Sequence, residues 1–285
     1  MAHAAFIPGW RHPAPERLEL YAEGALILRT VTATRYVTPL REGGSLPAIV
    51  EDDDDGMYVV KLRGAGQGPK VLIAELICGE LGRAIGLPIP EIVFMQIDPA
   101  LGRNEPDGEI QSLVIASGGL NLALDFLPGA LGFDPISAAL VDPDLAAAIV
   151  WFDALIMNVD RTARNPNLVW WHRNLWLIDH GAALYIHHTW GDYRTRARTP
   201  FAAIKDHVLL SAASDLRAID AQLAARITPE LLAKIVALVP DEWLAGDAAF
   251  PDIAAHRAAY IEYLLTRLEA PRAFVEEASR AGQRV

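Results

Sequence analysis

The segment Phe152 to Tyr185, FDALIMNVDRTARNPNLVWWHRNLWLIDHGAALY, governs how the rest of the chain is interpreted. An apolar run with helical periodicity ends at Met157 and leads into a loop that carries Asp160 and Arg161. Asn165 follows five residues after Asp160. The sequence therefore places a carboxylate and an amide close together, just beyond the end of a buried helix.

A tight hairpin follows this loop and brings a second carboxylate to the same place. Its predicted strands are Asn167 to Trp171 and Leu175 to Ile178, and the second strand runs directly into Asp179. A kinase needs a carboxylate to orient or deprotonate the attacking hydroxyl, and hard oxygen ligands for the magnesium that bridges the phosphates. The spacing predicts a phosphoryl-transfer centre in which Asp160 is catalytic and Asn165 and Asp179 bind Mg²⁺.

The Asp-Arg-x3-Asn loop at Asp160 and the Asp-x-Gly loop at Asp179 resemble those of the HipA-like kinases and, more distantly, the phosphoinositide lipid kinases. The lipid-kinase pattern has a histidine where this chain has Thr162. The resemblance implies a bilobal fold with ATP in the cleft, magnesium on Asn165 and Asp179, and Asp160 acting on the acceptor hydroxyl beside Arg161. The alternative is that Asp160 only pairs with a nearby arginine and Asp179 only caps a turn.

The resemblance covers roughly Pro39 to Tyr185 and implies an α+β, protein-kinase-like fold with a β-rich N-lobe and a helical C-lobe. The Pro-rich residues 1–20 are expected to form an N-terminal arm. Stretches rich in Val, Ile, Thr and Tyr predict strands in an N-lobe of residues 21–125, with one helix over Val71 to Gly86. Residues 126–285 are rich in Ala and Leu at helical spacing and are expected to form the C-lobe.

Two features of the predicted N-lobe suggest phosphate binding. The turn Gly43-Gly44-Ser45 lacks side chains that would keep backbone amides away from a phosphate, although an ordinary hairpin turn has the same composition. Only four of the 25 basic residues are lysines, and Lys61 lies in the apolar stretch MYVVK. That placement matches the strand lysine that contacts nucleotide phosphates in kinases. A lysine that faces solvent from an edge strand is the alternative.

Three further predictions concern the helix, the strand and the hinge that would surround the nucleotide. Glu75, on the helix after the lysine strand, is expected to hold Lys61 toward the phosphates, and Glu80 is the competing candidate. Ile110 to Ala116 is predicted to be a strand. Residues Ser117 to Gly129 are then expected to form the interlobe hinge, in which Phe126 would contact the adenine; a plain linker would have the same sequence.

Composition limits the other possibilities. The formal net charge of -11 argues against binding to a nucleic-acid backbone, because such proteins gather Lys and Arg. No stretch has the length of a membrane span or the apolar core of a signal peptide, so a cytoplasmic protein is expected. The single cysteine, Cys78, is expected in the core.

The sequence leaves three functions open. The preferred interpretation is a kinase that uses ATP and Mg²⁺ to phosphorylate a protein serine or threonine, in another protein or in itself. A small-molecule phosphotransferase is the second, but such enzymes usually carry a histidine two residues before the aspartate, where this chain has Asn158. The third is an ATP-binding module without catalysis, which the presence of Lys61, Asp160, Asn165 and Asp179 disfavours. The related toxin kinases work with an antitoxin partner, so the resemblance also raises that possibility.

Overall fold

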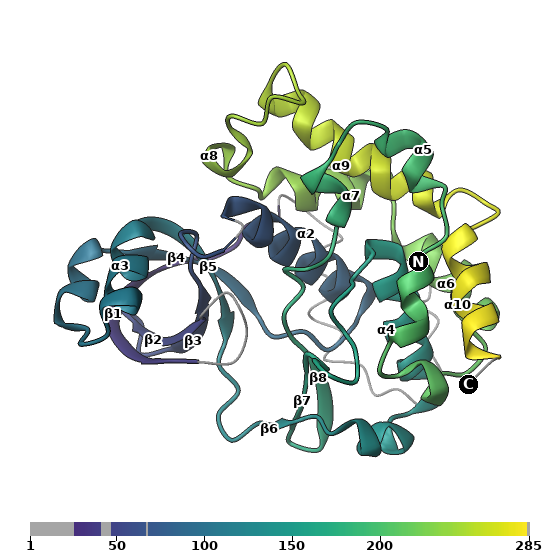
Figure 1. Cartoon of the computed structure of the whole chain (residues 1–285), viewed down its shortest axis with the longest axis horizontal. Helices are drawn as coiled ribbons and strands as arrows, with labels where there is room; N and C mark the ends of the chain where they lie inside the picture. Colours follow the sequence, from purple (N-terminus) through teal and green to yellow (C-terminus); the bar gives the residue numbers. More distant parts are fainter. Residues whose placement is uncertain (1–25, 41–46, 67, 284–285) are drawn as a thin grey trace.

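The computed structural model describes residues 26–40, 47–66 and 68–283, and these form two lobes. A β-barrel lies at one side of the molecule and the helices of the second half gather at the other, with helix α2 between them (Figure 1). The chain is α+β, with strands mostly in the first half and helices mostly in the second. The expected N-terminal arm, residues 1–20, lies outside the described residues.

The first lobe is a closed five-stranded barrel with the strand order β1-β2-β3-β5-β4. It closes because β1 pairs in parallel with β4, whereas every other neighbouring pair is antiparallel. The sequence predicts a β-rich lobe but not this closure, which depends on pairing between distant segments. The strands are β1 (Thr30–Pro39), β2 (Ala48–Asp52), β3 (Met57–Lys61), β4 (Ile92–Ile97) and β5 (Gly119–Asp125).

Helix α2 (Pro69–Ile85) is the central element of the molecule. It begins with a proline in its first turn and ends at Gly86, whose positive φ of 97° terminates the helix. It contacts β4 and β5 of the barrel, and also α6, α7 and α8 of the second lobe. Because 13 of its 17 residues are buried, its position is fixed by packing against both lobes.

Two sequence predictions in the first lobe are wrong. The expected strand Ile110 to Ala116 is helix α3 (Gly108–Ala116), which Asp107 caps by accepting the backbone N–H groups of Glu109 and Ile110. Only Ile110 and Val114 are buried in this helix, four residues apart. The surrounding residues are also mostly apolar, so this helical spacing cannot be recognised in the sequence. The expected linker 117–129 contains the central strand β5, so the connection between the lobes begins after β5, at Phe126.

The second lobe is built around helix α4 (Pro143–Ile156), in which every residue from Leu145 onward is buried. The guanidinium of Arg267 donates to the carbonyls of Ala154 (2.8 Å) and Leu155 (2.7 Å), which would otherwise lack partners at the C-terminal end of α4. This contact fixes the helix end from which the predicted catalytic loop leaves.

The remaining elements of the second lobe surround α4. A small sheet comprises β6 (Leu131–Gly132), β7 (Leu168–Trp171) and β8 (Asn174–Leu177), close to the predicted hairpin. The α-helices are α5 (Tyr193–Ala197), α6 (Leu216–Arg226), α7 (Pro229–Ala237), α8 (Asp241–Leu244), α9 (Ile253–Leu268) and α10 (Ala273–Gly282). Short 3-10 helices are η1 (Pro99–Asn104), η2 (Pro135–Leu140), η3 (Tyr185–His188), η4 (Ala202–Asp206) and η5 (Leu210–Ala212). Within the described ranges, no helix is both long enough and apolar enough to span a bilayer.

Candidate active site

The predicted catalytic loop starts where α4 ends. Met157 has a positive φ of 54°, which turns the chain out of the helix. The side chain of Asn158 then donates from Nδ2 to Asp153 Oδ1 (3.0 Å) and accepts the backbone N–H of Asp160 at Oδ1 (3.1 Å). Asn158 is thus a bridge between the buried helix and the residue predicted to be catalytic.

Two asparagines orient the half-buried carboxylate of Asp160. Asn165 Nδ2 lies 2.7 Å and Asn167 Nδ2 lies 3.3 Å from the same oxygen, Oδ2. Burial raises the pKa of Asp160; the hydrogen bonds from both asparagines oppose this rise, and the charge of Asp179 adds to it. A carboxylate with a raised pKa and one oxygen already bonded is suited to accept a proton at its other oxygen, Oδ1.

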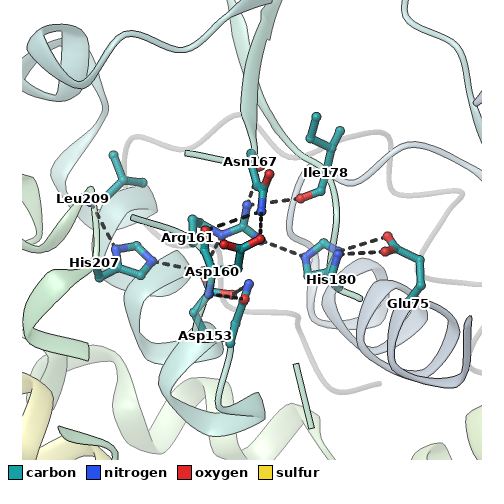
Figure 2. Close-up of polar contacts among 10 residues, drawn as sticks. Glu75, Asp153, Asp160, Arg161, Asn167, Ile178, His180, His207 and Leu209 are labelled. Carbon is teal, nitrogen blue, oxygen red and sulfur yellow. Dashed lines mark hydrogen bonds and ion pairs between the residues drawn. The ribbon is translucent and has the colours of Figure 1, made fainter. Parts of the chain in front are cut away.

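Arg161, which the sequence analysis grouped with Asp160 as catalytic, is 1% exposed. Its Nε lies 2.5 Å from Asp153 Oδ2, and its Nη1 donates to the carbonyls of both Asn167 and Ile178 (Figure 2). Arg161 Nη2 is also 3.2 Å from His180 Nε2. Each of these contacts is to another part of the site, so Arg161 joins the loop to the hairpin.

Asp153 and His207 form the base of this network, and neither is among the site residues predicted from the sequence. His207 Nδ1 accepts the backbone N–H of Leu209, so His207 Nε2 carries the proton that is donated to Asp153 Oδ2 at 2.9 Å. Burial raises the pKa of Asp153, but Arg161 and the hydrogen bond from His207 lower it more strongly. The sequence did contain one sign of this network. Asp153 is a carboxylate within the otherwise apolar run that forms α4, and a buried charge requires a partner.

The second predicted metal ligand, Asp179, follows β8 and has a positive φ of 56°. Its Oδ1 is 2.8 Å from Lys61 Nζ. Burial raises the pKa of Asp179, and the charge of Lys61 and its hydrogen bond outweigh that effect, so the pKa is lowered. Two residues on, Gly181 allows α2 to approach closely, since a Cβ there would lie 2.6 Å from Val71 Cγ1.

The structure distinguishes between the two glutamates considered for Lys61. Glu75 is fully buried, with Oε2 at 3.8 Å from Lys61 Nζ and 2.9 Å from the backbone nitrogen of His180. Glu80 instead lies 3.1 Å from Arg83 on the same helix. Glu75 therefore links α2 to both the lysine strand and the loop that contains Asp179.

His180 completes the connection between the lobes. Because a guanidinium can only donate, the contact with Arg161 makes His180 Nε2 the acceptor and leaves the proton on Nδ1. Nδ1 faces Glu75 Oε1 at 3.7 Å. A continuous set of buried polar contacts thus runs from Glu75 on α2 through His180 and Arg161 to Asp153 on α4 (Figure 2).

The other predicted nucleotide contacts are less well defined. Gly43, Gly44 and Ser45 lie outside the described residues. The backbone N–H of Phe126 donates to the carbonyl of Met57 at 3.0 Å, so this amide is already used inside the barrel. An adenine contact at Phe126 would therefore involve its carbonyl or side chain.

Replacing Lys61 with methionine is expected to weaken ATP binding by roughly ten- to a hundredfold, because a charge-assisted hydrogen bond contributes about 1.5–3 kcal/mol. A nucleotide titration measures this effect. Lys61→Arg is the matched control, because it keeps the charge between Glu75 and Asp179 and should melt within a few degrees of the wild type. Unchanged ATP affinity in a folded Lys61→Met protein would assign Lys61 a structural role only.

The fold, the paired loops and the lysine between two carboxylates define a kinase. The chain belongs to the HipA-like kinase family, whose model matches residues 34–276. No curated protein matches the sequence.

Two solved structures are similar at low sequence identity. The Helicobacter pylori proinflammatory kinase CtkA is 12% identical, with 88% of this chain and 98% of that chain covered and a TM-score of 0.49. A golgi casein kinase is also 12% identical, with 91% of this chain and 78% of that chain covered and a TM-score of 0.35.

Proposed function

We propose that this kinase transfers the γ-phosphate of ATP, in the presence of Mg²⁺, to a serine or threonine hydroxyl of a protein. The observation that carries this proposal is the pair of aspartates at the site. Asp160 is half-exposed, has a raised pKa and is held through one oxygen, whereas Asp179 has a lowered pKa and is paired with Lys61. Two carboxylates whose environments separate their pKa values are suited to different roles in one reaction.

In this proposal Asp160 orients the acceptor hydroxyl and takes its proton at Oδ1. Lys61, held by Glu75, contacts the nucleotide phosphates. Arg161 acts as a positioning residue, since its contacts are all within the site. The turn Gly43 to Ser45 and the segment at Phe126 are proposed to contact the phosphates and the adenine.

The residues present fit a magnesium ion. Asn165 is fixed through Nδ2 by Asp160, which leaves its oxygen as a ligand, and Asp179 supplies a carboxylate. Magnesium is commonly bound by one or two carboxylates together with substrate phosphates. The pKa of Asp160 is raised mainly by burial and further by repulsion from Asp179, and a cation between the two carboxylates would relieve that repulsion. When bound, the ion would neutralise charge on the phosphates.

A protein acceptor is favoured by the openness of the surface around Asp160. The neighbouring Val159 is 41% exposed, and Tyr185, just after the loop of Asp179, is 51% exposed. Sites for small molecules bury roughly 70–90% of their ligand. An exposed apolar side chain next to Asp160 in the chain, that of Val159, suits an extended peptide better than an enclosed metabolite.

The proposal is tested by incubating the purified protein with γ-labelled ATP and Mg²⁺, separately with cell extract, with a metabolite panel and alone. We expect label in serine or threonine of a protein, with Asp160→Asn as the inactive control. Label that enters only a metabolite would identify a small-molecule phosphotransferase instead. The absence of transfer with tight ATP binding would identify a module that only binds nucleotide.

Replacing Asp179 with asparagine is expected to lower the affinity for ATP in Mg²⁺ roughly tenfold, because it removes the charge that faces the ion. The affinity in EDTA should change much less. The titration is repeated at several magnesium concentrations. Equal magnesium dependence in mutant and wild type would contradict the assignment of Asp179 as a ligand.

A further inference from the structure

A pocket outside the active site is lined by the segment that joins α8 to α9. Lys70 in the first turn of α2 pairs with Asp247 of this segment, and Figure 1 shows α8 beside the end of α2. His256 and the residues from Leu244 to Ile253, other than Ala249, line a volume of about 410 Å³. Pockets for small ligands have volumes of roughly 300–1,000 Å³. The walls are mostly apolar, with Leu244, Phe250 and Ile253 among them.

Two carboxylates are part of the lining. Asp247 accepts the backbone N–H of Ala249 at Oδ1 (3.0 Å), and its Oδ2 lies 3.2 Å from Lys70 Nζ. Asp252 caps α9 by accepting the backbone N–H of Ala255 at Oδ1 (2.7 Å). Lys70 balances the charge of Asp247, so Asp252 leaves the lining with a net negative charge.

The third polar group is His256, which is 2% exposed. Its Nδ1 is 3.2 Å from the carbonyl of Leu244, so Nδ1 carries the proton and Nε2 is an acceptor. Nε2 has no hydrogen-bond partner in the part of the chain that the structure describes. The ring is held by stacking on Phe250 at a centroid distance of 4.4 Å. Burial also lowers the pKa of His256, which keeps Nε2 an acceptor near neutral pH.

The imidazole nitrogen without a donor and the two carboxylates, each of which can accept further hydrogen bonds beside its present donors, select a particular ligand chemistry. An anion would be repelled by Asp247 and Asp252, whereas a group with several N–H donors and a positive charge would satisfy both carboxylates and the imidazole. The apolar walls suit a short hydrocarbon chain attached to that group. We propose that this pocket binds an ammonium or guanidinium group carried on a short apolar chain, in addition to the kinase function of the cleft.

The occupant would compete with Lys70 for Asp247. Lys70 lies in the first turn of α2, and it also donates to the backbone carbonyl of His187, just after the loop of Asp179. Five residues further along the same helix, Glu75 faces Lys61. A ligand that releases Lys70 would thus loosen the end of α2 that lies nearest the active site.

The proposal is tested by calorimetric titration of the full chain with n-butylguanidine and n-butylamine. The matched control is n-butylurea, which has nearly the same shape as n-butylguanidine but no charge. We expect saturable binding of the two cations with a Kd of roughly 0.1–10 mM, the range for ligands of this size, and none of the urea. Equal binding of the urea, or no saturable binding of either cation, would overturn the proposal.

Two variants test the assignment of the residues in opposite directions. Lys70→Met removes the competing cation and should tighten n-butylguanidine binding roughly tenfold, a gain that misfolding cannot produce. His256→Phe keeps the stacking but removes the acceptor and should weaken binding by a similar factor, with melting temperature and ATP affinity as checks of folding. Unchanged affinity in Lys70→Met would contradict the predicted competition at Asp247.

The same chemistry could be supplied by a free amine or by a basic side chain of a partner. A capped tripeptide with a central arginine is therefore titrated beside n-butylguanidine, with the same peptide carrying citrulline as control. If the arginine peptide binds at least tenfold more tightly than n-butylguanidine, the occupant is a peptide segment. If its binding is weaker than that threshold, the occupant is a free amine. Equal binding of the arginine and citrulline peptides, like that of the urea, would count against a charge-selective pocket.

Discussion

Replacing Asp160 with asparagine is expected to lower the rate of phosphoryl transfer by roughly 10²–10⁴, because the amide keeps the shape of the carboxylate but cannot take the proton. The affinity for ATP in Mg²⁺ should stay within about a factor of three, since Asp160 is not assigned as a metal ligand. Asn165 and Asn167 can still donate to the oxygen of the new side chain, so the loop should keep its conformation. Single-turnover kinetics and a nucleotide titration on the same preparation measure both quantities.

The rate of the wild type should also depend on pH in a way that Asp160 explains. Because the pKa of Asp160 is raised, the rate should fall on acidification at a higher pH than an ordinary aspartate, with its pKa of about 3.9, would give. Near wild-type turnover in Asp160→Asn would remove this residue from the mechanism. A large loss of thermal stability along with the loss of activity would instead mean that Asp160 mainly holds the loop.

Replacing Asp153 with alanine is expected to destabilise the protein by about 3–5 kcal/mol, the usual cost of removing one partner of a buried ion pair. Arg161 and Asp153 are both fully or almost fully buried, so the arginine would be left charged and without its carboxylate. His207 would lose its acceptor as well. Denaturant unfolding at pH 7 measures the free energy of unfolding, and the loss of stability should appear as a lower denaturant concentration at the midpoint of the transition.

Glu269→Ala is the matched control for this measurement. Glu269 pairs with Arg198 at 2.5 Å, but both side chains are 57% exposed. Exposed pairs contribute roughly 0–1 kcal/mol, because water solvates the charges when the pair is broken. If the two variants were destabilised equally, burial would not be the reason for the importance of Asp153.

The sequence placed Asp160, Asn165 and Asp179 in one short loop and hairpin, which allow few arrangements. The structure brings Asn165 Nδ2 to 2.7 Å from Asp160 Oδ2, and Asp179 is close enough for its charge to raise the pKa of Asp160 beside the larger effect of burial. Lys61 and Glu75 were predicted from their order along the chain, and the structure places their charged groups 3.8 Å apart. The functional roles of these residues remain predictions that the variants above test.

What the sequence missed depends on contacts between distant segments. His207 lies 54 residues from Asp153, and no local pattern connects the two. The parallel pairing of β1 with β4, which closes the barrel, likewise joins segments separated by more than 50 residues. Helix α3 was predicted as a strand because a short apolar run fits both the helical period of 3.6 residues and the strand period of two. Asp107, a typical N-cap residue, was the feature of the sequence that favours a helix there.

The closed barrel also limits how other chains can attach to the first lobe. In an open sheet, the outer strands carry unpaired backbone groups that can accept a strand from a partner or from another copy. Here each of the five described strands has a neighbour on both sides. Among the described strands, a partner strand could therefore add only along the part of β1 beyond its three pairs with β4, or to the small sheet of β6, β7 and β8, whose order leaves β6 and β8 at its edges.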